Sequence, residues 1–92
     1  MKRKPALLWD VWNKEHITKH GITVKEAEET YRVCEFLITA KYGRTQVLTR
    51  LQRGRLITIF LSYKKQKRPY VVSARDASQK ERRWYYEQTQ TN

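Results

Sequence analysis

Three things are scarce in this sequence of 92 residues: cysteine, long hydrophobic runs and, over its middle part, acidic residues. Cys34 is the single cysteine, so an internal disulfide and a cysteine-rich zinc site are both excluded, and a reducing compartment fits. The N-terminus has no signal-peptide core, and no apolar run reaches the roughly 20 residues that cross a bilayer. We therefore expect a cytoplasmic protein that does not bind membranes.

The shortage of acid is concentrated in one stretch. Lysine and arginine number 20 against 9 acidic residues, for a net charge of +11, yet no carboxylate lies between Glu35 and Asp76. That stretch carries ten basic residues: Lys41, Arg44, Arg50, Arg53, Arg55, Lys64, Lys65, Lys67, Arg68 and Arg75. Basic strands can simply prevent edge-to-edge aggregation, but that does not require acid to be excluded. We therefore favour a surface that binds the phosphates of nucleic acid.

The length fits one domain over residues 1–92, with a core from about 7 to 87 and frayed ends at 1–5 and 88–92. Capping and glycine signals place helices at 10–20, from Thr23, and from Ser78 to about Glu87. Residues 7–9 fit a short edge strand, and residues 64–67 a charged turn. Alternation predicts strands at 36–42, 44–51 and 70–75, and the run 56–63, apolar on both faces, fits a central strand. The class is α+β: two N-terminal helices, a four-stranded, mostly antiparallel sheet, and a C-terminal helix.

Alternation also predicts which strand residues share a face. If Phe36, Val47 and Val72 point to the core, the opposite face carries a basic, hydroxyl-bearing set. That set comprises Lys41, Arg44, Gln46, Arg50, Ser73 and Arg75. From it we take Lys41, Arg44, Arg50 and Ser73 as the RNA-binding candidates.

The missing carboxylates also restrict the chemistry, because a two-metal nuclease needs them clustered. A ribonuclease without metal or cofactor needs only groups that move protons and offset charge on the phosphate. Arg82 and Tyr85 are spaced to converge on one side of the last helix. His16 and His20 share a face of the first helix, but two ligands make a weak zinc motif, so we expect no metal site. Both histidines also have structural explanations, most clearly His20, which suits the helix dipole.

The pattern as a whole resembles the BrnT family of ribonuclease toxins. The resemblance runs from about Leu8 to Glu87 and is most specific at Val72-Ser73-Ala74-Arg75 followed by Glu81-Arg82-Arg83 and Tyr85. The opening of the family is matched by Trp9-Asp10, Asn13, His16-Ile17, His20-Gly21-Ile22 and Glu26-Ala27, and its strand signals by Gly43-Arg44 and Gly54-Arg55-Leu56. Trp12 and Asn13 stand where better-known members have a lysine, as in a variant subgroup.

The resemblance implies a RelE-like toxin fold and metal-independent RNA cleavage that halts growth. It also implies a cognate BrnA-like antitoxin with a ribbon-helix-helix part. The toxin would then contact DNA only indirectly, through this antitoxin. Carried over by residue, it implicates Arg75, Arg82 and Tyr85, together with His20 and Arg44. With His16, the catalytic candidates are then Arg75, Arg82, Tyr85, His20 and His16. The alternative is a binding protein without catalysis, either an RNA-binding module or a toxin homologue that blocks another target such as a gyrase-like enzyme.

Overall fold

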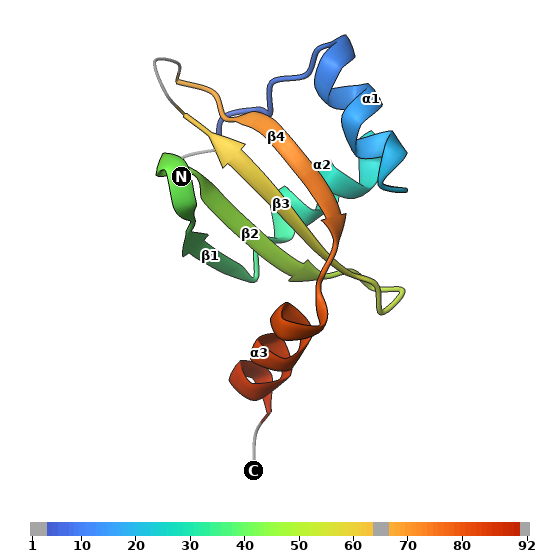
Figure 1. The fold of residues 1–92 in the computed structure, drawn as a ribbon, viewed down its shortest axis with the longest axis vertical. Coiled ribbons are helices and arrows are strands. Elements are labelled where there is room, and N and C mark those ends of the chain that lie inside the picture. Colours follow the sequence, from blue (N-terminus) through green and yellow to red (C-terminus); the bar gives the residue numbers. More distant parts are fainter. Residues whose placement is uncertain (1–3, 64–66, 91–92) are drawn as a thin grey trace.

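The computed structural model describes residues 4–63 and 67–90, which form three α-helices and a four-stranded sheet (Figure 1). The elements are α1 (Val11–Lys19), α2 (Val24–Val33), β1 (Phe36–Thr39), the 3-10 turn η1 (Lys41–Gly43), β2 (Thr45–Arg50), β3 (Leu56–Ser62), β4 (Tyr70–Asp76) and α3 (Gln79–Thr89). The strands lie in chain order and all pair antiparallel. The predicted α+β layout is thus confirmed. The expected turn residues 64–66 and the expected frayed residues 1–3 and 91–92 lie outside the described residues.

Helix ends follow the signals in the sequence. After α1, the N–H of Ile22 donates to the carbonyl of Ile17 at 3.0 Å, and Gly21, at φ 79°, donates to Thr18 at 2.9 Å. This is the Schellman ending that a glycine allows without strain. The expected capping boxes at Thr23 and Ser78 are both present. A third box, at Asp10, opens α1.

Several element ends differ from expectation. The first strand ends at Thr39 rather than at 42, because the chain turns through η1, where Tyr42 adopts a left-handed conformation at φ 63°. The expected strand at residues 7–9 is reduced to one parallel bridge between Leu8 and Tyr70. At the other end, α3 continues to Thr89, two residues beyond Glu87.

The register corrects one expectation about the faces. Phe36 pairs with Leu48, so these two side chains share a face of the sheet. Val47, the residue before Leu48, points to the opposite face. A β-bulge near Phe60 and Leu61 also shifts the register of β4. The turn between β1 and β2 determines which residues of these two strands pair, and the alternation within each strand does not reveal it.

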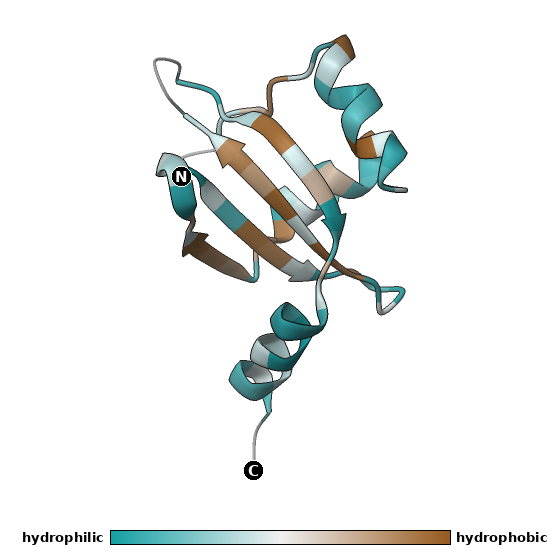
Figure 2. Cartoon of the chain, in the orientation of Figure 1, coloured by the Kyte–Doolittle hydropathy of each residue, from teal (hydrophilic) through white to brown (hydrophobic). Residues whose placement is uncertain are grey.

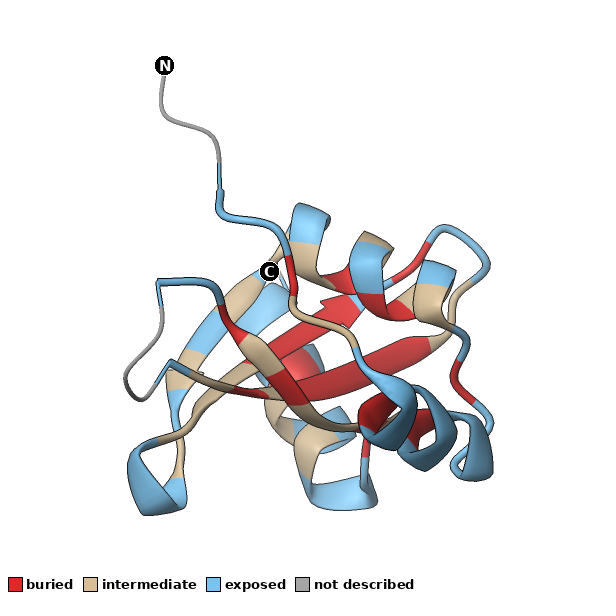
Figure 3. Cartoon of the chain, turned by 90° about the horizontal axis from the view of Figure 1, so that it is seen from above, coloured by how far each residue is buried: buried red, intermediate tan, exposed pale blue. Residues whose placement is uncertain are grey.

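Helices cover the two faces of the sheet unequally. Ile17 of α1 and Ala27 of α2 pack with Val47, Ile59 and Ala74 in one fully buried cluster. On the other face α3 supplies Tyr85 and the half-buried Trp84, which pack on Leu48, Leu56 and Phe36. Figure 1 shows α3 at one end of the sheet, and Figure 3 shows the buried residues concentrated in the strands and in the helix surfaces against them. The face carrying Leu48 is therefore only partly covered.

In Figure 2 both β1 and β3, which lies between β2 and β4, are largely hydrophobic, whereas α3 is largely hydrophilic. Five residues of β3 are fully buried: the apolar Leu56, Ile57, Ile59 and Leu61, and Thr58. None of the helices in the described part of the chain has both the length and the hydrophobicity needed to span a bilayer.

Candidate nucleic-acid interface

A groove of about 770 Å³ lies on the α3 face of the sheet, between the η1 turn and the first turns of α3. Its volume is within the range of pockets that hold small ligands. The groove is lined by Ile38, Thr39, Ala40, Lys41, Tyr42, Arg44, Gln46, Leu48, Phe60, Val72, Ser73, Lys80, Glu81 and Trp84. Residues of all four strands and of η1 therefore line the groove together with residues of α3.

Apolar side chains form much of the groove. Phe60 from β3 and Trp84 from α3 are both half-buried, so part of each ring remains accessible. The Trp84 ring meets Phe36 edge-on, with 5.0 Å between centroids, which fixes its position against β1. Tyr42, at the turn, is 85% exposed. The groove thus offers aromatic surface to a ligand, and aromatic surface is what nucleic-acid bases stack on.

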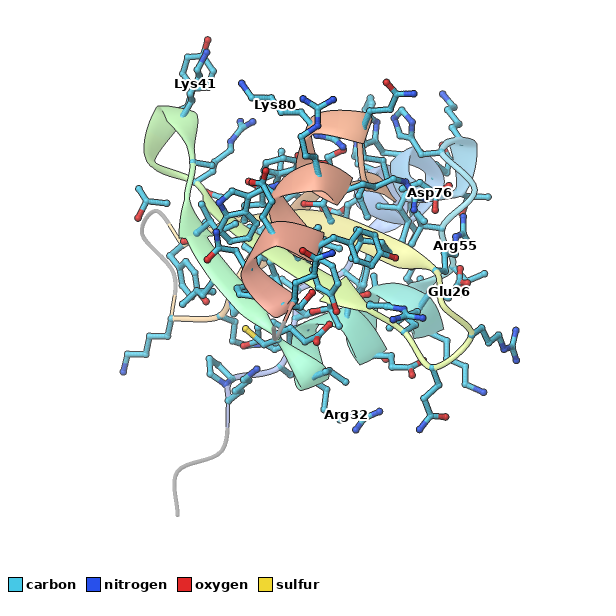
Figure 4. The ribbon with its side chains drawn as sticks, turned by 90° about the horizontal axis from the view of Figure 1, so that it is seen from below. Glu26, Arg32, Lys41, Arg55, Asp76 and Lys80 are labelled. Atoms are coloured by element: carbon cyan, nitrogen blue, oxygen red, sulfur yellow. The ribbon has the colours of Figure 1, made fainter. Side chains whose placement is uncertain are left out.

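Cationic side chains lie along the same groove. Lys41 and Arg44 come from the η1 turn and its end, and Lys80 comes from the first turn of α3. Figure 4 shows Lys41 and Lys80 extending toward the same side of the molecule from these two elements. Glu81 is the one carboxylate among the described residues that line the groove. The lining is consequently suited to an anion rather than a cation.

Glu81 is held by four hydrogen bonds. Its carboxylate accepts two bonds from Arg75, at 2.7 and 3.0 Å, one from the Ser78 backbone at 2.9 Å, and one from the Gln46 amide at 2.9 Å. The same Gln46 nitrogen donates to Thr58 at 2.8 Å. Arg75 also lies 5.4 Å from the centre of the Phe60 ring. This network fixes the position of α3 over the sheet.

The network also keeps Glu81 ionised. Burial alone would raise the pKa of Glu81, but hydrogen bonds from Arg75 and from the Ser78 backbone, with the Arg75 charge, hold it below its usual value of 4.5. Because all its favourable acceptor positions are occupied, Glu81 orients its neighbours and has no free lone pair suited to abstracting a substrate proton.

Tyr85 anchors α3 further along the helix. Its hydroxyl donates to both carboxylate oxygens of Glu35, at 2.8 and 3.0 Å, and its side chain is only 4% exposed. Burial and the Glu35 carboxylate raise the pKa of Tyr85 to about 12. At neutral pH the hydroxyl is therefore protonated and engaged, under α3 rather than in the groove.

The predicted site residues fall into separate groups. Lys41, Arg44 and Ser73 line the groove together. Register places Arg50 and Arg75 on the same sheet face, as expected, although neither lines the groove.

Three further candidates lie elsewhere. His16 and His20 are exposed on α1, with 5.0 Å between ring centroids. Since α1 packs on the opposite face of the sheet, the structure does not bring them to the groove. Arg82 is exposed on α3, close enough to Asp76 to lower the pKa of that carboxyl, after the larger effect of Arg55.

Arg55 belongs to a structural cluster on another side of the molecule. Its guanidinium bonds Asp76 at 2.7 Å, Glu26 at 2.8 Å and the Gly21 carbonyl at 2.9 Å, and Figure 4 shows the three charged side chains together. The hydrogen bonds to Asp76 and the two carboxylate charges raise the pKa of Arg55. The cluster ties together the α1–α2 turn, α2 and the end of β4.

Sequence patterns alone do not identify several groove residues. Lys80 and Trp84 precede and follow the conspicuous Glu81-Arg82-Arg83 run, and Glu81 is visible only as half of a capping box. The alternation of β2 does place Gln46 with Ser73, which the register confirms: Gln46, Phe60 and Ser73 form one row across three strands.

The described residues contain no group of three histidine, cysteine, aspartate or glutamate side chains arranged to hold a metal ion. No protein-family model, curated protein or solved structure matches this chain.

Proposed function

We propose that this chain is a metal-independent endoribonuclease toxin of a type II toxin–antitoxin pair, with a RelE-like fold, and that it binds RNA in the groove between η1 and α3. The observation that supports this most is the pairing of Lys41, Arg44 and Lys80 with aromatic surface in one groove. Phosphates bind to cationic groups and bases stack on aromatic ones, so an RNA strand satisfies both halves of the groove.

The cleavage step we propose uses the substrate's own hydroxyl. The 2′-oxygen forms a bond to the adjacent phosphorus as the bond to the 5′-oxygen breaks, leaving a 2′,3′-cyclic phosphate and a 5′-hydroxyl. One proton leaves the 2′-hydroxyl and one reaches the departing 5′-oxygen. Arg44 and Lys80 offset the charge that collects on the phosphoryl oxygens.

Proton transfer then falls to groups at the groove. Tyr42 and Lys80 both line it, and no hydrogen bond joins either side chain to another described residue. Tyr42 also holds a left-handed backbone conformation, which is costly for an aromatic residue and is typical of functional positions. In this scheme Arg75 is a positioning residue, because its guanidinium is engaged by Glu81.

Cleavage without metal is tested with purified protein, a long RNA and excess chelator. We expect fragments that end in cyclic phosphate, and we expect the Tyr42→Phe and Lys80→Ala variants to cleave at least tenfold more slowly. Products that appear only when Mg²⁺ is added would refute the metal-independent reaction.

Groove binding is tested through salt dependence. A plot of log affinity against log salt has a negative slope, and removal of one phosphate contact should make that slope shallower by about 0.7 for a single strand. We expect this for Arg44→Ala and for Lys80→Ala. Arg32→Ala is the matched control, because Arg32 is an exposed arginine on α2, across the sheet from the groove. Equal losses in all three variants would show that only net charge matters.

The cellular role we propose is growth arrest, relieved by a BrnA-like ribbon-helix-helix antitoxin. Expression of the chain alone should stop growth, and Arg44→Ala with Lys80→Ala should restore it while the protein still accumulates. The neighbouring reading frame, co-expressed, should bind the chain and relieve arrest. A chain that is harmless without any partner would contradict the toxin assignment.

A second candidate is RNA binding without cleavage. The observation that favours it is that Arg75 and Tyr85 are both engaged by carboxylates and that both histidines lie on the far side of the sheet. Tight RNA binding with no products, in chelator or in Mg²⁺, would select this candidate.

A further inference from the structure

One row of side chains across the floor of the groove has a chemistry that phosphate binding does not use. Gln46, Phe60 and Ser73 are paired directly across β2, β3 and β4, so they point to the same face. The first and last are two strand spacings apart, about 10 Å. The row therefore presents an amide, an aromatic ring and a hydroxyl side by side, beneath Trp84 at the groove wall.

The orientation of the Gln46 amide is fixed by its partners. Its nitrogen has two hydrogens, and these are used by the Thr58 hydroxyl at 2.8 Å and by Glu81 at 2.9 Å. An ionised carboxylate only accepts hydrogen bonds, so the nitrogen must face Glu81. The atom left over is the amide oxygen, an acceptor.

That oxygen is accessible to solvent and belongs to a residue that lines the groove. No donor from the described residues bonds the Gln46 Oε1, and no buried side-chain oxygen or nitrogen in the described part of the chain lacks a partner. Oε1 must then be accessible to solvent, and Gln46 lines the groove. Ser73 likewise lines it without a hydrogen bond from its hydroxyl to another described residue.

From this arrangement we propose that the groove holds an unpaired nucleobase of single-stranded RNA, and that Gln46 is the specificity-determining residue that accepts a hydrogen bond from the edge of that base. This inference rests on the proposed RNA binding and adds the strandedness of the substrate. Bases in a duplex are stacked and paired, so only an unpaired base can enter a groove walled by Trp84 and reach its floor. The phosphates beside that base are then within the field of Lys41, Arg44 and Lys80.

The role of Glu81 follows from the same geometry. It holds the amide so that an acceptor, and not a donor, faces the ligand. Arg75 holds Glu81 in turn. The base that binds must therefore direct an N–H group at Gln46, and Ser73, on the other side of Phe60, has a hydroxyl that can donate to or accept from another polar atom of the base.

Fluorescence anisotropy with short oligonucleotides tests this. The probes are 2′-O-methyl hexanucleotides of A, C and U, which cannot be cleaved through the 2′-hydroxyl, and an abasic hexamer with the same phosphates. All are measured with the full chain in excess chelator. We expect at least one base-bearing hexamer to bind about tenfold more tightly than the abasic hexamer, and a blunt-ended duplex, in which every base is paired, to bind no better than the abasic one.

The variants separate the role of Gln46 from general binding. Gln46→Met keeps the length of the side chain and should lower affinity for the preferred hexamer about fivefold to tenfold more than it lowers affinity for the abasic hexamer. Gln52→Met is the matched control, because Gln52 is an exposed glutamine at the β2–β3 turn. Ser73→Ala, which removes no hydrogen bond within the described fold, should also reduce preference among the bases.

The outcomes distinguish this inference from the function beneath it. If the wild-type chain binds abasic and base-bearing hexamers equally, the base site is refuted although phosphate binding remains. If Gln46→Met weakens all probes alike, including the abasic one, Gln46 does not contact the base. If the wild-type chain binds none of the probes, the proposed RNA binding itself fails.

Discussion

Replacement of Tyr85 by phenylalanine distinguishes an anchoring residue from one that transfers protons to a substrate. The change removes a single oxygen and leaves the buried ring packed on Phe36, whose centroid is 5.6 Å away. What is lost is a charge-assisted hydrogen bond to Glu35, with distances of 2.8 and 3.0 Å. Such bonds contribute about 1.5–3 kcal/mol. Because Glu35 is exposed and water can replace the hydroxyl, we expect the low end, about 1.5 kcal/mol.

Urea and thermal unfolding measure this loss. For a domain of this size, a change of 1.5 kcal/mol lowers the melting temperature by roughly 6–12 °C. Tyr86→Phe is the matched control, since Tyr86 is the adjacent tyrosine, 40% exposed, and its hydroxyl bonds no other described residue. In a Glu35→Gln background the Tyr85 change should cost less, which a double-mutant cycle detects.

The pH dependence gives an independent check. Tyr85 titrates near 10 when unfolded and near 12 when folded, so the folded state retains this proton more strongly. The stabilisation by Tyr85 is therefore complete below about pH 10 and is lost as the pH rises through 12. The difference between the wild type and Tyr85→Phe should shrink over that interval. A variant with unchanged stability and abolished RNA cleavage would refute the anchoring role.

Two further predictions concern the structural cluster around Arg55. Arg55→Ala should cost about 1–2 kcal/mol at pH 7, because two partly exposed ion pairs and a backbone contact are lost together. Arg55 is the chief cause that lowers the pKa of Asp76, whereas the Thr23 backbone and then Arg55 lower that of Glu26. The ion-pair part of this stabilisation is therefore present above their usual pKa values of 3.8 and 4.5 and is lost as the pH falls through the lower folded values. Urea unfolding at pH 7 and at successively lower pH should show the cost of Arg55→Ala shrink toward that of the Gly21 contact, and a constant cost would contradict it. Gly21→Ala should lower the free energy of unfolding by about 1 kcal/mol, measured by thermal unfolding. The cause is the φ of 79° alone, because the added Cβ would lie 3.7 Å from Arg55, which is an ordinary contact. Gly21→Asn should cost less, since asparagine tolerates this conformation better, and equal losses would contradict a backbone origin.

The sequence by itself determined the elements and the charge. Capping residues at Thr23 and Ser78 and the glycine after α1 act within a few residues of the chain, so they specify helix ends without tertiary help. The absence of acid from 36 to 75 likewise makes the strands basic in any arrangement.

Only the tertiary structure decided which charges meet. Glu35 precedes the acid-free stretch and Glu81 follows it, five residues after Asp76, and pairing and packing bring both to the same sheet face, where they bind Tyr85 and Arg75. Whether Phe36 pairs with Val47 or with Leu48 depends on the turn between β1 and β2. A shift of one residue in this register would move every side chain of the strand to the opposite face of the sheet. The histidines are separated from the groove because α1 covers the other face, which depends on contacts between residues far apart in the chain. Local sequence patterns cannot specify such contacts. The groove between η1 and α3 could therefore be identified only from the tertiary structure.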